Sequence, residues 1–322
     1  MGSSYTRTVI RASPELKSSR LKDRPIFKQA LKSWQLYILI LPAIVYLFIF
    51  NYIPMYGLQI AFKDYRTSLG IMGSTWVGLK NFIRFLTYPR FLQILINTLR
   101  ISLYLIATFP CSVILALMIN ELDSRKFKKT VQMITYMPHF ISIVVICSMI
   151  QLFLNRSTGL LNNIVETLGG ARIDFLAQPS MFASIFVWSD VWQGVGWGTV
   201  IYLAALSSVS TELVESAQIE GASRLKILLH INIPHIMPTI VIMLILRCGS
   251  VLNVSFEKIF LLQNSLNIEV SEVISTYVYT MGLINGQFSY SAAIGLFNTV
   301  INVIVLLFVN FICKRISSVG LW

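Results

Sequence analysis

The chain has 322 residues, of which 55% are hydrophobic and only 12% are charged, and its mean hydropathy is +0.70. Soluble domains carry about twice that share of charged residues, so this composition excludes an ordinary soluble enzyme and indicates a polytopic membrane protein. The net charge of +12 does not indicate a nucleic-acid binder. The basic residues cluster beside apolar runs, where lipid headgroups and membrane topology account for them.

Residues 1–33 are basic and polar, and residues 24–33 within them are expected to form an interfacial helix. Six apolar runs follow, each long enough for the roughly 20 residues that a membrane-spanning helix needs. The first run is too long for a signal-peptide core and is expected to be an uncleaved anchor. The expected spans are 34–62, 95–119, 131–154, 181–206, 239–262 and 288–313. Residues 316–322 form a short tail.

Lys and Arg residues are unequally divided between the two sets of segments that flank these spans. Sixteen lie in residues 1–33, 120–130, 210–238 and the C-terminal residues, against seven in the segments on the other side. Positive residues mark the cytoplasmic side, so both termini and residues 210–238 are expected to face the cytoplasm. The predicted fold is therefore all-α, with a six-helix transmembrane domain over residues 34–315 and both termini cytoplasmic.

A polar, helix-forming segment at 210–238 separates the fourth span from the fifth, and its residues 215–238 read ESAQIEGASRLKILLHINIPHIMP. Ser210 or Thr211 can cap a first helix, and Gly221 can end or bend it. Ser223 can cap a second helix. The segment is therefore predicted to be a structured loop of two helices.

A proline is expected to end the second of these helices. Pro234 has no backbone donor and disfavours the α region at Ile233 before it. Pro238 then lies at the start of the next apolar run, where a first-turn proline is acceptable.

This segment resembles the cytoplasmic EAA loop of binding-protein-dependent ABC importers, whose pattern is EAA, three residues, Gly, nine residues and I-x-L-P. Gly221 follows Ala217 after three residues, and Ile231 follows Gly221 after nine. Ser216 replaces the family's Ala, and Ile233 replaces its Leu. The resemblance implies a coupling-helix loop that docks on a separate ATPase subunit. The residues expected to form it are Glu215, Ser216, Ala217, Glu220, Gly221, Ala222, Arg224 and Pro234.

The resemblance further implies a transporter subunit without catalytic residues, in the bacterial cytoplasmic membrane. No GxxxxGK[ST] pattern occurs, so the chain cannot hold ATP phosphates in the P-loop manner, and ATP with Mg²⁺ is expected on two partner ATPase subunits. A second permease and an extracytoplasmic binding protein, meeting the loops 63–94, 155–180 and 263–288, are also implied. The four cysteines and three histidines are scattered, so no metal site is predicted.

Three stretches are similar to those of maltose-type permeases for oligo- and polysaccharides. They are RKFKKTVQMITYMPHF from Arg125, the Trp-rich fourth span, and EVISTYVY ending at Tyr279. The narrowest resemblance is to an alginate-importer permease. An acidic polymer would suit Arg247 and Lys258.

Polar side chains within spans are costly and are candidates for function. Trp188 and Trp192 are four residues apart and share a helix face, and with Asp190 and Gln193 they can form a saccharide platform. The alternative is an interfacial aromatic belt with a snorkelling aspartate. Gly194, Gly196 and Gly198 loosen this helix or allow close packing.

The fifth span carries the other candidates for the substrate path, Arg247, Asn253 and Glu257. Arg247 can line the path or pair with an acidic residue of a neighbouring helix. Asn298 and Asn302, four residues apart on the sixth span, are expected to form interhelical hydrogen bonds.

A different class stays open, namely an ion-driven secondary transporter or a channel in which the polar loop is only structural. Asp190, Arg247 and Glu257 are too few and too widely spaced to indicate a proton relay. An ATPase partner would distinguish the importer from this alternative.

Overall fold

The computed structural model describes residues 34–317 and 319–321, and the interfacial helix expected at 24–33 lies outside them. The chain up to Gly57 and the chain from Leu58 onward form two separate compact units. The described part of the first unit is helical, and its elements are α2 (Trp34–Leu47), the π-helical turn η1 (Phe48–Tyr52) and α3 (Ile53–Met55).

The second unit is also built mainly of helices. Its α-helices are α4 (Gly70–Gly73), α5 (Lys80–Leu86), α6 (Phe91–Ala107), α7 (Pro110–Asn120), α8 (Arg125–Tyr136), α9 (Ile143–Phe153), α10 (Leu160–Thr167), α11 (Pro179–Leu206), α12 (Thr211–Ile219), α13 (Arg224–Ile227), α14 (Ile233–Cys248), α15 (Phe256–Leu262), α16 (Ile268–Ser271), α17 (Ile274–Tyr279) and α18 (Phe288–Ser317). Shorter 3-10 or π segments are η2 (Tyr56–Phe62), η3 (Met137–Phe140), η4 (Leu228–Asn232) and η5 (Thr280–Ile284). Within the described residues, the strands β1 (Lys63–Asp64) and β2 (Thr75–Trp76) pair antiparallel.

Four helical runs are long and apolar enough to cross a membrane: Trp34–Phe62, Phe91–Asn120, Arg224–Cys248 and Phe288–Ser317. Two bent pairs raise the count to six if each pair is one span. They are Arg125–Phe140 with Ile143–Phe153, bent by 96°, and Pro179–Leu206 with Thr211–Ile219, bent by 80°. The described chain is thus a polytopic helical protein of four to six spans, and the predicted six is the upper limit.

The fifth span has other bounds than the sequence predicts. α14 ends at Cys248, and a stretch without regular helix separates it from α15. The amide oxygen of Asn302 accepts a hydrogen bond from the backbone of Leu252 at 3.0 Å, and the hydroxyl of Ser275 donates to the carbonyl of Val254 at 3.3 Å. Because side chains satisfy these backbone groups, the helix can break inside an apolar sequence.

Pro234 does not stop the second helix of the polar segment, so that expectation is wrong. Ile233 keeps helical angles, φ −62° and ψ −50°, and the chain runs as one helix from Arg224 to Cys248. The π-helical turn η4 directly precedes the proline, and Ile233 donates to the carbonyl of Leu228. The wider turn accommodates the proline ring that would clash with an ordinary α-helical carbonyl.

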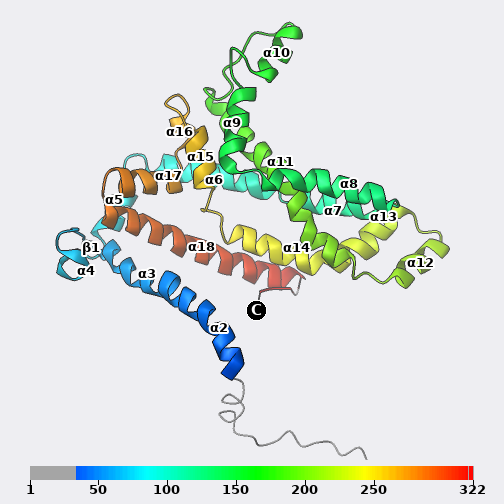
Figure 1. Ribbon diagram of the computed structural model, residues 1–322, viewed down its shortest axis with the longest axis horizontal. Coiled ribbons are helices and arrows are strands. Elements are labelled where there is room, and N and C mark those ends of the chain that lie inside the picture. The colour runs from blue at the N-terminus through cyan, green and yellow to red at the C-terminus, as the bar shows by residue number, and fades with distance from the viewer. Residues whose placement is uncertain (1–33, 318, 322) are drawn as a thin grey trace, which may run out of the picture. The chain divides into compact units, whose positions relative to one another are not determined.

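α11 lies at the centre of the second unit and packs against α6, α7, α8, α14 and α16 (Figure 1). Its glycines permit the closest of these contacts. A Cβ at Gly196 would collide with the backbone carbonyl of Thr135 on α8, and one at Gly198 would lie 2.5 Å from the hydroxyl of Ser112 on α7. The close packing expected of these glycines therefore holds for Gly196 and Gly198, whereas a Cβ at Gly194 would meet nothing within 4 Å. α11 also contributes Phe182 and Phe186 to a buried core with residues of α6, α9 and α15.

Candidate functional site

The α12–α13 hairpin carries the EAA-like residues, and its ends are fixed by local caps. The Ser210 hydroxyl accepts from the backbone of Leu213 at 3.4 Å, and the Ser223 hydroxyl accepts from Lys226 at 3.4 Å. Gly221 ends α12 with φ of +81°, in the left-handed region that favours glycine. The backbone of Ala222 donates to the carbonyl of Ala217 at 2.9 Å, which completes a helix-ending turn.

The hairpin exposes large apolar side chains, two of them, Ile219 and Leu225, beside the α12–α13 connection that forms its tip. Ile219 is 88% exposed, Leu225 is 64% exposed and Leu213 is 55% exposed. Such side chains are costly to leave in water, and as a group they mark a surface for another chain. The EAA-like residues Glu215, Ser216, Glu220 and Arg224 are also on the exposed surface of the hairpin, whereas Ala217 and Ala222 are partly covered.

The rest of the hairpin rests on the loop that follows α7. Arg224 forms an ion pair of 3.2 Å with Asp123, although both side chains are largely exposed. The amide of Asn232 donates to the carboxylate of Glu121 at 3.4 Å. A cavity of about 460 Å³ lies between this loop, the end of α11 and the hairpin, and Glu215 and Gln218 are among its lining residues. Pro234 lies beyond the hairpin, within the first turn of α14.

A second candidate site is a charged cluster formed by Asp190 on α11, Arg247 on α14 and Lys258 on α15. One Asp190 oxygen lies 3.9 Å from the Arg247 guanidinium, and the other lies 3.6 Å from the Lys258 ammonium. Lys258 is 1% exposed and its ammonium lies 5.0 Å from the ring of Phe186. Asp190 and Arg247 are partly exposed and line two adjoining cavities of about 190 and 380 Å³.

In this cluster Arg247 pairs with an acidic residue of a neighbouring helix, which is one of the two roles expected for it. Lys258 is not among the site residues that the sequence predicts. Its position next to Glu257 on an apolar run gave no signal of burial against Asp190, 68 positions earlier in the chain.

The structure does not gather Trp188, Trp192, Asp190 and Gln193 on one surface. Trp188 and Trp192 are 54% and 47% exposed, whereas Asp190 turns toward α14 and α15. The Trp188 indole donates to the Tyr104 hydroxyl at 2.9 Å, and the Gln193 amide donates to the carbonyl of Ile141 at 3.2 Å. A saccharide platform on the two tryptophans stays a prediction, but Asp190 does not belong to that surface.

The remaining path candidates have different positions. Asn253 lines the 190 Å³ cavity and accepts a hydrogen bond of 2.8 Å from Asn298 on α18. Asn302 accepts from the backbone of Leu252, so both asparagines bond to the non-helical stretch between α14 and α15 and not to another helix as expected. Glu257 is exposed on α15 and is not part of the charged cluster.

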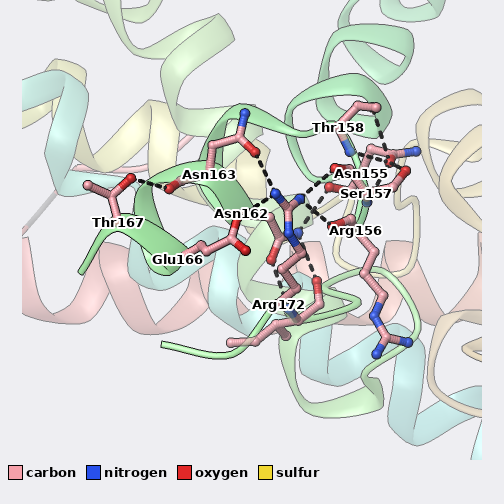
Figure 2. Close-up of polar contacts among 10 residues, drawn as sticks. Asn155, Arg156, Ser157, Thr158, Asn162, Asn163, Glu166, Thr167 and Arg172 are labelled. Atoms are coloured by element: carbon pink, nitrogen blue, oxygen red, sulfur yellow. Dashed lines mark hydrogen bonds and ion pairs between the residues drawn. The ribbon is translucent and has the colours of Figure 1, made fainter. Parts of the chain in front are cut away.

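Residues 154–176, here called the polar knot, connect α9 to α11 and fold on their own side chains (Figure 2). Asn162 is fully buried and donates to the carbonyls of Asn155 and Ile173 at 3.0 and 2.9 Å, while accepting from the backbone of Ile173. Arg172 bonds the carbonyls of Arg156 and Ser157 and forms an ion pair of 2.6 Å with Glu166. The knot thus satisfies these polar groups from within, while its Leu176 carbonyl accepts a hydrogen bond from Asn267 outside it at 2.9 Å.

The segment after α15 is anchored at the end of α6 remote from the hairpin. The Asn97 amide donates to the carbonyls of Glu269 and Glu272, and the Thr98 hydroxyl accepts from Ile274. Glu272 also forms an ion pair of 3.2 Å with Arg90. Burial raises the pKa of the Glu272 carboxyl above its usual value, and Arg90 opposes this shift. In the described residues, no group of His, Cys, Asp and Glu could hold a metal ion.

Comparison with known proteins gives a match to one family over most of the chain. The model described as "Binding-protein-dependent transport system inner membrane component" matches residues 94–318. This range contains both the hairpin and the charged cluster.

Two similar proteins come from Bacillus subtilis (strain 168). The polygalacturonan/rhamnogalacturonan transport system permease protein YteP is 41% identical over 302 residues, which cover 94% of each chain. Protein LplB is 42% identical over 288 residues, covering 89% of this chain and 91% of the relative. A chain in the crystal structure of a bacterial alginate ABC transporter, in complex with an alginate pentasaccharide-bound periplasmic protein, aligns with a TM-score of 0.84. It is 39% identical in sequence, and the alignment covers 92% of this chain and 100% of that one.

Proposed function

The chain belongs to the family of binding-protein-dependent transport system inner membrane components, and from this membership we propose that it forms the translocation path of an ATP-driven importer of oligo- or polysaccharides. As a permease subunit of a sugar ABC importer, it is a transporter component and not an enzyme. Two separate ATPase subunits would bind ATP and Mg²⁺. A second permease and an extracytoplasmic binding protein would complete the assembly, with the hairpin and both termini on the cytoplasmic side.

The exposed tip of the α12–α13 hairpin is the observation that carries the proposal. Capped ends make the hairpin rigid, while Ile219, Leu225 and Leu213 leave it incomplete without a partner. A groove on an ATPase subunit would cover these side chains. The helix that starts at Arg224 continues into the membrane to Cys248, so a movement of the docked hairpin would reach the translocation path.

The substrate class rests on the relatives and on the interior of this chain. Two of the relatives are named for alginate and polygalacturonan or rhamnogalacturonan, which are polysaccharides with acidic sugars. The two cavities beside Asp190 and Arg247 carry these charged side chains and Ser250 on walls that are otherwise largely apolar, and charged groups inside a membrane domain are candidates for a substrate path. We therefore assign oligo- or polysaccharides, with alginate as the narrowest candidate.

Saccharide uptake into proteoliposomes that contain the whole assembly tests the energy source. Uptake is expected to stop when the P-loop lysine of the partner ATPase is changed, and to continue when ionophores collapse ion gradients. The reverse pattern would replace the importer with the ion-driven secondary transporter.

Gly221→Val tests the coupling role of the hairpin. A Cβ at this position meets nothing within 4 Å in this chain, but a β-branched residue is strained at φ of +81°. We expect uptake to fall more than about tenfold while the complex stays inserted, because the strain of about 1–3 kcal/mol disturbs the docked hairpin. Gly295→Val is the control, since Gly295 also has open space and no positive φ.

Gly221→Asn separates backbone strain from contact with the ATPase, because asparagine tolerates the left-handed conformation. Recovery of uptake with Asn would assign the defect of Val to backbone geometry, and equal loss would assign it to close approach of the partner. Normal uptake with Gly221→Val would refute the coupling role.

A further inference from the structure

The charged cluster in the membrane domain is short of one negative charge. Arg247 and Lys258 are both cations, and the carboxylate of Asp190 is shared between them. Among the described residues, no other acidic side chain forms an ion pair with either cation, and the neighbouring Glu257 is exposed away from them. Charges in a membrane domain are costly and are candidates for function, and with one carboxylate for two cations, Arg247 can still accept an anion from the cavity.

The three side chains differ in how far they are buried behind the cavity wall. Lys258 is 1% exposed and its ammonium makes no hydrogen bond, so it depends on Asp190 most strongly. Arg247 has 44% of its side chain exposed and borders both cavities. Asp190 lies between them, and an entering ligand meets Arg247 and Asp190 before it can reach Lys258.

The two ion pairs also differ in how readily a carboxylate from a ligand can replace Asp190 as the partner of the cation. The Arg247–Asp190 separation of 3.9 Å is too long for a hydrogen bond, so the guanidinium fork has no close carboxylate partner there. A free carboxylate can bind such a fork through two parallel hydrogen bonds, which are among the stronger contacts in proteins. Asp190 can then stay paired with Lys258 while the free carboxylate pairs with Arg247, so each cation has one carboxylate.

We propose that Arg247 is the residue that recognises the acid group of the transported saccharide, and that Asp190 is a place-holder for that group, anchored by Lys258. In the empty state Asp190 partly neutralises both cations. When a uronate unit enters the cavity, its carboxylate binds the Arg247 guanidinium, and Asp190 stays paired with Lys258 alone. A neutral sugar makes no such exchange, so the cluster selects acidic saccharides. This inference rests on the proposed saccharide function.

A matched pair of probes tests the proposal: trigalacturonate and its methyl ester, which differ in charge at the acid groups. Binding is measured on the purified complex of permeases and ATPases in lipid nanodiscs, without the binding protein, so that any preference comes from the membrane subunits. The unaltered complex is expected to bind the acid form about ten to a hundred times more tightly, the range for a hydrogen-bonded charge.

Arg247→Gln is expected to remove most of this preference and to leave affinity for the methyl ester unchanged. Arg247→Lys keeps the charge without the fork and should restore part of the preference. Arg125→Gln removes the same charge from the start of α8, remote from the cavity, and should change neither affinity. Binding of the ester, together with co-purification of the ATPases, shows that each variant is folded.

Asp190→Asn tests the place-holder role. Both cations then lack their internal carboxylate, so the acid probe should bind more tightly and leave more slowly, and uptake of the acid form should slow. Unaltered affinity and release in this variant would refute the place-holder role.

Several outcomes would overturn the proposal for Arg247. They are equal binding of acid and ester by the unaltered complex, binding of neither, and equal loss of both in Arg247→Gln. None of them bears on the proposed function, which is judged separately by ATP-dependent uptake and the P-loop lysine.

Discussion

The polar knot and the α12–α13 hairpin are both short polar segments between apolar helices, but they satisfy their groups differently. In the knot, Asn162 and Arg172 bond to the backbone of the same segment. In the hairpin, Ser210 and Ser223 satisfy only the helix ends, and the tip exposes Ile219. The knot makes its polar contacts within this chain, whereas the hairpin leaves large apolar side chains uncovered in it. A knot mutation should therefore act on stability, and a hairpin mutation should act on assembly.

Asn162→Ala should give the largest effect. It leaves the partly buried carbonyl of Ile173 and the backbone donor of the same residue without their Asn162 partner, at a cost of about 3 kcal/mol. We expect faster proteolysis of residues 154–176 in the purified complex, with ATPase association unchanged. Asn163→Ala is the control, because the side chain of Asn163 makes one hydrogen bond at the surface, accepting from Arg172. Similar proteolysis of both variants would show that the knot does not depend on its buried amide.

Ile219→Asp should have the next largest effect, and on assembly alone. Ile219 is 88% exposed, so the charge costs the fold little. At the centre of an apolar contact it should weaken ATPase association by about 2 kcal/mol, or about thirtyfold. Leu168→Asp, at a residue of the knot that is 82% exposed, should leave association unchanged. If Leu168→Asp weakened association as much, the contrast between the two regions would be wrong.

Ser210→Ala should have the smallest effect. Loss of an N-cap costs about 1 kcal/mol, so amide hydrogens of residues 211–215 should exchange about fivefold faster. Ser210→Asp keeps a side-chain acceptor and should exchange like the unaltered protein. Equal exchange in the Ala and Asp variants would show that this cap does not hold the hairpin.

The sequence was informative where the determinants are local. Ser210, Gly221 and Ser223 have the conformations and bonds that their residue types predict, because caps and turns involve neighbours within a few positions. The helix end predicted at Pro234 was wrong because a π-helical turn before the proline lets the helix continue. Whether such a turn forms depends on how the continuous helix packs, which local residue types do not specify. The break after Cys248 was also hidden, since Asn302, 50 positions after Leu252, stabilises it.

The charged cluster could be predicted only in part. The cost of charge in a membrane singled out Asp190 and Arg247, and an acidic neighbour was one of the two roles considered for Arg247. The contact between Asp190 and Lys258 depends on where α15 lies against α11, which the separate helix patterns do not specify.

One continuous helix, from Arg224 to Cys248, connects the two candidate sites, so a movement at one end reaches the other. Arg224 stands at the hairpin and Arg247 at the cavity, 23 residues apart, which is roughly 34 Å along a helix that rises 1.5 Å per residue. A tilt of about 10° around the hairpin end would carry the far end through roughly 6 Å on that length. The ion pair with Asp190 spans only 3.9 Å, so a displacement of that size would break or re-form the contact between Arg247 and Asp190.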